Sequence, residues 1–206
     1  MNDDTQLLDI TREISPDMAI YPNNAAVEFE LLQEAGEGKN TLSKVTLGTH
    51  TGTHIDTPHH IHADGPGALT YDLSQMNGQC EVVDVSHLES VITAADIPET
   101  TQSRVLFKTR NSNRDPNTFD DDFVALDDSA AEECVARGLQ LVGLDALSIR
   151  KRGTKNQVHE ILIDNNVVIV EGLWLAEVDA GTYELLCLPI KWDLDGAPAR
   201  CVLRAS

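Results

Sequence analysis

The stretch Thr49-His50-Thr51-Gly52-Thr53-His54-Ile55-Asp56-Thr57-Pro58-His59-His60 holds four of the chain's seven histidines and one carboxylate, Asp56. Imidazole nitrogens and carboxylate oxygens at this density are typical ligands of a borderline divalent ion such as zinc or manganese. The stretch therefore predicts a metal site. The alternative is a polar surface loop in which the histidines occur by chance.

The spacing of these residues constrains the backbone. In an extended strand, His50 and His54 would lie roughly 13 Å apart at about 3.3 Å per residue, too far for two ligands of one ion. A helix is disfavoured because threonines and a glycine fill the run and a proline follows it. The remaining solution is a sharp bend at Gly52, where a residue without Cβ accepts a positive φ. After such a bend both histidines and Asp56 can share one ion. His60 then lies beyond the proline.

Size and charge limit the class of protein. A chain of 206 residues fits a single domain, residues 1–206, with a full hydrophobic core. Acidic residues outnumber basic ones by 34 to 15, and the net charge of −19 disfavours nucleic acid and anionic membranes as partners. Scattered cysteines without a Cys-x-x-Cys pair predict reduced thiols and a cytoplasmic protein. Residues 1–4 are acidic, so we predict no signal peptide, and no apolar run is long enough to span a bilayer.

Hydrophobic patterns along the chain predict an α/β protein. Residues 27–31 alternate strictly, which indicates a strand with one solvated face. A capping-box pattern at 129–132 begins a helix, and the buried strand 139–144 follows it, in the order typical of α/β folds. Residues 195–198 predict a turn before a final strand at 200–203. Other elements are predicted as strands at 7–14, 41–47, 80–85, 105–108, 167–172 and 183–192 and as a short helix at 158–165.

Two residues outside the histidine stretch are further candidate ligands. His159 lies near the start of a short predicted helix, and Glu171 is the last side chain of a β-branched strand. A carboxylate that ends such a strand needs a partner if it is buried, and a metal would supply one. A structural role for both residues is the alternative.

A basic loop stands out in this acidic chain. It carries Arg150, Lys151, Arg152 and Lys155. We interpret it either as a solvated loop with local charge pairs or as a clamp or lid for a substrate carboxylate.

The histidine stretch contains the pattern His-x-Gly-Thr-His-x-Asp-x-Pro-x-His at positions 50–60. This pattern resembles the motif of the cyclase-like metal-dependent hydrolases, whose best-known members are bacterial kynurenine formamidases, and the similarity extends over nearly the full chain. The resemblance implies a swivelling, layered β/β/α fold of the α/β class, with a mixed sheet and short helices. It also implies a homodimer or higher homo-oligomer, with the site near the subunit interface.

The resemblance assigns roles to particular residues. It implies that His50, His54 and Asp56 hold one metal ion and that Asp56 bridges to a second. It implies that His159 and Glu171 complete the ligands of the second ion. It also implies that His60 is the general acid/base and that Tyr21 is an aromatic residue that binds the substrate. His60 as a further ligand is the alternative.

The resemblance implies an amide hydrolase that acts on a small molecule. The activity expected is that of an arylformamidase, which converts N-formyl-L-kynurenine to L-kynurenine and formate in tryptophan catabolism. Water activated by Zn²⁺, or alternatively Mn²⁺, would attack the carbonyl while His60, with a reference pKa of about 6.5, carries the proton. The alternatives are a related cyclic-amide or lactone hydrolase, such as an isatin hydrolase, and a non-catalytic metal-binding protein. Tyr21-Pro22-Asn23-Asn24 stands where the formamidases have Trp-Pro-Gly-Asp, in a region expected to choose the substrate.

Overall fold

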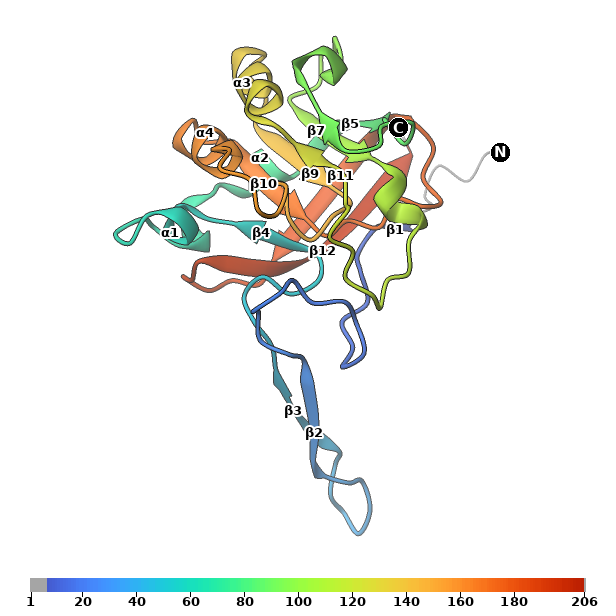
Figure 1. Ribbon diagram of the computed structural model, residues 1–206. Helices are drawn as coiled ribbons and strands as arrows, with labels where there is room; N and C mark the ends of the chain where they lie inside the picture. The colour runs from blue at the N-terminus through green and yellow to red at the C-terminus, as the bar shows by residue number, and fades with distance from the viewer. Residues whose placement is uncertain (1–6, 206) are drawn as a thin grey trace.

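A mixed β-sheet that closes on itself forms the centre of the computed structural model, which describes residues 7–205 (Figure 1). Its strands follow the order β1-β12-β11-β5-β7-β9-β10-β4, and β4 pairs with both β10 and β12. The pairs β2–β3 and β6–β8 form two small separate sheets. The strands are β1 Leu7–Asp9, β2 Glu28–Gln33, β3 Leu42–Thr46, β4 His54–Asp56, β5 Gly78–Asp84, β6 Val91–Ile92, β7 Arg104–Lys108, β8 Ala125–Leu126, β9 Leu141–Leu144, β10 Val168–Glu171, β11 Gly181–Pro189 and β12 Gly196–Ala205.

The helices are short, as predicted, so the α/β class with a mixed sheet is confirmed. No helix within residues 7–205 has the length and apolar character needed to cross a membrane. The prediction about residues 1–4 lies outside the described part of the chain. The helices are α1 Pro58–Ile61, η1 Ala68–Thr70, α2 Leu73–Met76, η2 Ala94–Asp96, η3 Arg110–Asn113, α3 Asp128–Ala136 and α4 Val158–Asp164.

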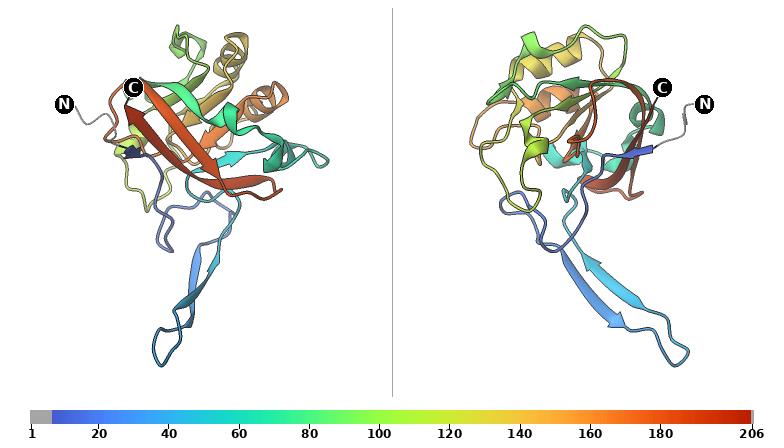
Figure 2. Two further views of the ribbon diagram at one scale, coloured as in Figure 1. Left: turned by 180° about the vertical axis from the view of Figure 1, so that it is seen from behind. Right: turned by 90° about the vertical axis from the view of Figure 1, so that its right-hand side faces the viewer.

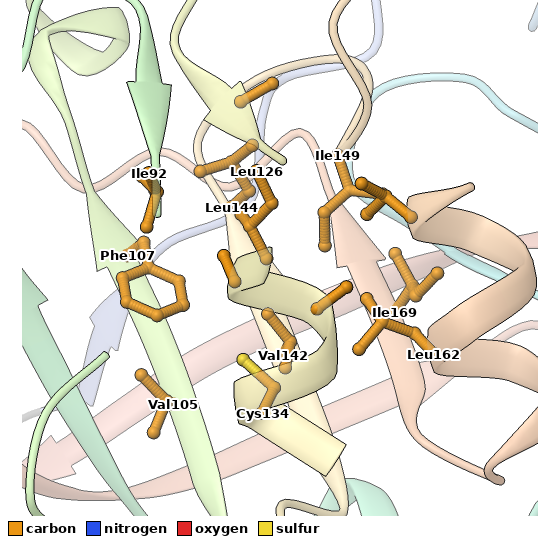
Figure 3. Close-up of a cluster of buried hydrophobic side chains, with 14 of the residues drawn as sticks. Ile92, Val105, Phe107, Leu126, Cys134, Val142, Leu144, Ile149, Leu162 and Ile169 are labelled. Atoms are coloured by element: carbon orange, nitrogen blue, oxygen red, sulfur yellow. The ribbon is translucent and has the colours of Figure 1, made fainter. Parts of the chain in front are cut away.

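The parallel strands β7, β9 and β10 are buried on both faces, which explains their continuous apolar runs, whereas the fourth parallel strand, β5, alternates between buried and more exposed residues. In β7, Val105 and Phe107 join the cluster that packs under α3 and α4 (Figure 3). Leu106 points the other way, into a second cluster enclosed by the sheet with residues of β10, β11 and β12. The same alternation holds in β9, where Val142 and Leu144 face the helices.

Two local predictions were wrong. The N-cap of α3 is Asp127, whose carboxylate accepts a hydrogen bond from the backbone N–H of Ala130, and not Ser129. The predicted turn at 195–198 lies largely inside β12, which begins at Gly196. There Gly196 pairs with Asp56 of β4. A segment whose sequence is typical of a turn therefore forms part of the sheet.

A β-hairpin formed by β2 and β3 projects from the body of the protein, and we call residues 28–46 the arm (Figures 1 and 2). The alternation predicted at 27–31 is present: Phe29 and Leu31 share one face, while Glu30 on the other face pairs with Lys44 at 3.1 Å. The expectation that one face would be covered is wrong for this chain alone, because every residue of β2 is exposed.

Candidate metal centre

The predicted bend is present and is held by a contact with the end of β10. Gly52 has a φ of 63°, and its carbonyl lies against Gly172, whose φ is 69°. The Thr53 hydroxyl donates a hydrogen bond of 2.6 Å to the carbonyl of Gly172. The chain then enters β4, which places His54 opposite Glu171 in the sheet.

The bend brings His50, His54 and Asp56 together, with one ligand atom from each within 4.8 Å of the others. His50 Nδ1 lies 2.9 Å from Asp56 Oδ1, and His54 Nε2 lies 3.5 Å from the same oxygen. His54 Nδ1 lies 3.0 Å from the carbonyl oxygen of Gly52. Donation of a proton to that carbonyl leaves Nε2 as the nitrogen with a free lone pair, directed at the carboxylates.

The other oxygen of Asp56 faces a second set of residues. His159, on α4, places its Nε2 3.3 Å from Asp56 Oδ2 and 3.2 Å from Glu171 Oε1. Glu171 Oε2 also lies 3.4 Å from His54 Nε2. The five residues predicted as ligands are therefore neighbours, and Asp56 lies between the two sets.

The residues present fit a divalent cation. His54 and Asp56 are 1% and 0% exposed, and within the described chain His54 Nε2 and Asp56 Oδ2 have no hydrogen-bond partner. Buried polar atoms without partners are costly, and here they belong to good ligand types that point at one another. A cation among these nitrogens and oxygens would satisfy them.

The electrostatics of the cluster support this fit. Burial acts to lower the pKa of His54 and His159, but their interaction with the nearby carboxylates of Asp56 and Glu171 outweighs it and raises each pKa to about 10. Burial acts to raise the pKa of Asp56, yet the nearby imidazoles of His159, His50 and His54 hold that pKa well below the ordinary value. Two buried carboxylates thus attract positive charge, which protons supply in the absence of metal.

His60 lies at the open side of the cluster, on α1. Its ring centroid is 4.2 Å from that of His50 and 5.5 Å from that of His159. Burial among these groups lowers the pKa of His60, against the attraction of Asp56. One ligand atom of His60 lies within 4.8 Å of ligand atoms of Asp56 and His159, so the alternative of His60 as a ligand stays open at this point.

A cavity of about 230 Å³ opens in front of these residues. Its wall includes Tyr21, whose ring packs edge-on against Phe119 with centroids 5.3 Å apart. Arg150, from the basic loop, also lines this cavity. The structure therefore places Tyr21 and His60 at the same opening.

Two residues at this centre were missed by the sequence analysis. Asp195 Oδ2 lies 3.1 Å from His50 Nε2, and a Cβ on Gly196 would come within 2.8 Å of the His50 ring. No sequence pattern pointed to them, because Asp195-Gly196 is ordinary turn chemistry. Only the pairing of β12 with β4 brings them to the histidine.

Comparison with known proteins agrees with this geometry. Residues 8–151 match the model of a family described as "Putative cyclase". The chain belongs to this cyclase family. The matched range ends before His159, Glu171 and Asp195.

Relatives and solved structures extend the cyclase-family match to nearly the whole chain. The chain is 33% identical over 205 residues to a kynurenine formamidase from Salinibacter ruber, covering 96% of this chain and 97% of that protein. It is 32% identical over 203 residues to a kynurenine formamidase from Bacillus anthracis, with 96% of each chain covered. A solved structure of a potential metal-dependent hydrolase with cyclase activity superposes with a TM-score of 0.87 at 32% identity, covering 97% of both chains.

These findings confirm the family predicted from the motif. They also confirm the expectation of a hydrolase of carbon–nitrogen amide bonds at the level of the family. An isatin hydrolase structure matches with a TM-score of 0.80 over 97% of this chain and 92% of that chain, but at 19% identity it shows a shared fold alone.

Proposed function

We propose that this cyclase-family chain is a metal-dependent arylformamidase that hydrolyses N-formyl-L-kynurenine to L-kynurenine and formate. The observation that carries the proposal is the pairing of buried Asp56 and Glu171 with three imidazoles beside the exposed His60. The kynurenine formamidases among its relatives support the choice of substrate.

We propose Zn²⁺ as the metal, with Mn²⁺ as the alternative, because nitrogen and oxygen ligands suit both. His50, His54 and Asp56 would hold one ion. Asp56, His159 and Glu171 would hold a second, and the two oxygens of Asp56 already face the two sets. When bound, a divalent ion supplies Lewis acidity and makes water a stronger acid and a better nucleophile.

The chain's own residues supply the proton transfer. A lowered pKa keeps His60 neutral near pH 7, so its imidazole can accept a proton from the attacking water. The same imidazole can return that proton to the departing amine nitrogen, and formate and the free amine are the products. Tyr21, whose ring packs edge-on against Phe119, presents an aromatic face to the cavity against which the aryl group of the substrate can pack.

Kinetics with the purified, metal-loaded protein test this proposal. We expect hydrolysis of N-formylkynurenine and little or no hydrolysis of isatin. In His60→Ala, kcat should fall about 10²–10⁴-fold because general acid/base catalysis is lost, while the bound metal per chain stays the same. His62→Ala is the matched control, since the His62 side chain forms an ion pair of 2.7 Å with the surface residue Asp164, outside the centre.

Two outcomes would contradict it. Turnover of isatin without turnover of N-formylkynurenine would favour the cyclic-amide alternative. Loss of metal in His60→Ala would make His60 a ligand instead of the acid/base.

We also propose that the protein is a homodimer joined through the arm. The apolar face of the arm exposes 52% of Phe29, 59% of Leu31 and 53% of Val45 to solvent. Exposed apolar side chains gathered on one projecting hairpin are typical of a surface covered by another chain. A second copy of this chain could cover this face without any other protein being present.

We propose a cytoplasmic location on the basis of the thiols. All four cysteines are free and buried, including Cys187 and Cys201, which are direct partners across β11 and β12. Disulfides are rare in the reducing cytosol. Alkylation under denaturing conditions of protein taken directly from cells should label every thiol, and a Cys187–Cys201 disulfide would contradict this location.

A further inference from the structure

In the basic loop, Lys151 and Arg152 have close local partners, whereas the guanidinium of Arg150 has no such close partner within residues 7–205. The Lys151 ammonium donates to the carbonyl of Phe123 at 2.6 Å, and Arg152 forms an ion pair with Asp121 at 2.7 Å. These two residues fit the first interpretation of the loop, as a solvated segment with local charge pairs. Arg150 differs, because within residues 7–205 it forms no ion pair, and its guanidinium makes only a long contact of 3.5 Å with the carbonyl of Asn156.

The backbone that carries Arg150 is fixed beside the metal centre. The N–H of Ile149 donates a hydrogen bond of 2.6 Å to Glu171 Oε1, one of the predicted ligands. The carbonyl of Ile149 accepts a bond of 3.0 Å from the N–H of Leu126, and Leu126 and Arg150 form a parallel bridge. The side chain of Arg150 therefore starts from a rigid position next to the reacting centre.

Arg150 faces the cavity in front of His60. Tyr21 and Glu171 line the same cavity. Among its described lining residues, Arg150 is the one arginine or lysine. The charges of Arg152 and Arg150 both act on Tyr21, where they oppose the rise in pKa that burial causes. Of these two arginines, Arg150 lines the cavity together with Tyr21, and Arg152 does not.

Charge explains why a cation at this place matters. With a net charge of −19, the protein repels anionic molecules in general. A guanidinium that has no carboxylate partner of its own is free to bind an incoming one, and its planar donors match a carboxylate in a bidentate pair.

We propose that Arg150 is a specificity residue that binds the carboxylate of the substrate. The substrate class is then an N-formyl arylamine that carries a carboxylate remote from the formamide, and a neutral formamide would lack this contact. The inference rests on the proposed formamidase function and deepens it. Arg150 acts in binding, while the bond cleavage itself belongs to the metal centre and His60.

Two substrates and three variants test this inference. The substrates are N-formylkynurenine, which carries a carboxylate, and formanilide, a neutral formamide of an arylamine. A hydrogen bond to a charged group contributes about 1.5–3 kcal/mol, which corresponds to about 10–150-fold. In Arg150→Ala we expect the ratio of kcat/KM for N-formylkynurenine to kcat/KM for formanilide to fall by about that factor, mainly through KM.

The other variants separate charge from structure. Arg150→Lys should retain part of the ratio, because a lysine keeps the charge without the bidentate geometry. Arg152→Ala, in the same loop but paired with Asp121, should keep the wild-type ratio. Turnover of formanilide reports in each case that the variant is folded and holds its metal.

The results separate a failure of the Arg150 proposal from a failure of the proposed formamidase function. If the wild-type protein hydrolyses neither formamide, the proposed function is wrong and the inference falls with it. If the wild type hydrolyses both and Arg150→Ala leaves the ratio unchanged, the function stands and the role of Arg150 is wrong. An equal loss with both substrates would likewise overturn it, because a carboxylate contact cannot affect formanilide.

Discussion

Asp56 is the residue at which the two ligand sets meet. It is fully buried, and its two oxygens face different imidazoles, His50 on one side and His159 on the other. A carboxylate so placed needs positive charge on both sides. Around it, contacts with the rest of the chain set the orientation of each imidazole: Gly52 orients His54, and Asp195 orients His50.

Asp195→Asn should weaken metal binding. Burial acts to raise the pKa of Asp195, but attraction and a hydrogen bond from His50 outweigh it and lower that pKa, so the group is an anion at neutral pH. Loss of a carboxylate that orients a ligating histidine typically costs about 10–100-fold in metal affinity. Competition with a chromophoric zinc chelator measures this, and the exposed neighbour Asp193→Asn is the control. Equal affinities in the two variants would show that Asp195 does not act on His50.

The elements that build the centre are the ends of three strands and one helix. β4 lies between β10 and β12, so His54 faces Glu171 on one side, while Asp56 pairs with Gly196 on the other. The helix α4 directly precedes β10 and adds His159. The bend at Gly52 fits against the end of β10 because Gly172 has no side chain, and this contact decides how closely the strands can approach.

Gly172→Ala should therefore cost more stability than an ordinary glycine substitution. A Cβ there would lie 2.1 Å from the carbonyl oxygen of Gly52, in addition to the strain of a φ of 69°. Gly138→Ala is the matched control, with a φ of 72° and nothing within 4 Å of the added carbon. The left-handed backbone alone costs about 1–2 kcal/mol, so urea unfolding should show that loss in Gly138→Ala and a clearly larger one in Gly172→Ala. Similar losses would mean that the contact with Gly52 relaxes freely.

The whole molecule combines a closed sheet with a projecting arm. The sheet encloses one apolar cluster and carries the other beneath α3 and α4, so the body has its own core (Figure 3). The arm adds nothing to either cluster. Its apolar face is therefore not part of the core of the single chain. The organisation of residues 1–206 as one domain stays a prediction.

Phe29→Asp should convert a wild-type dimer to a monomer. The substitution places a charge on the exposed apolar face of the arm, where the proposed partner would bury it, and leaves the core of the chain untouched. Sedimentation velocity measures the change. Lys44→Ala, on the other face of the arm, should remain dimeric, because its exposed pair with Glu30 lies away from the apolar face. A monomeric wild-type protein would contradict the proposed role of the arm.

The sequence by itself determined the chemistry of this protein: the ligand types, the bend at Gly52 and the α/β class all follow from spacings within a few residues. Local spacing is enough there, since a turn or a strand is fixed by its own residues. Only the tertiary structure decided that Asp195 meets His50 across 145 positions, that Arg150 alone among the four basic residues of its loop lines the cavity, and that the arm stands free. These outcomes depend on which distant strands pair and which faces remain uncovered, and no local pattern encodes either.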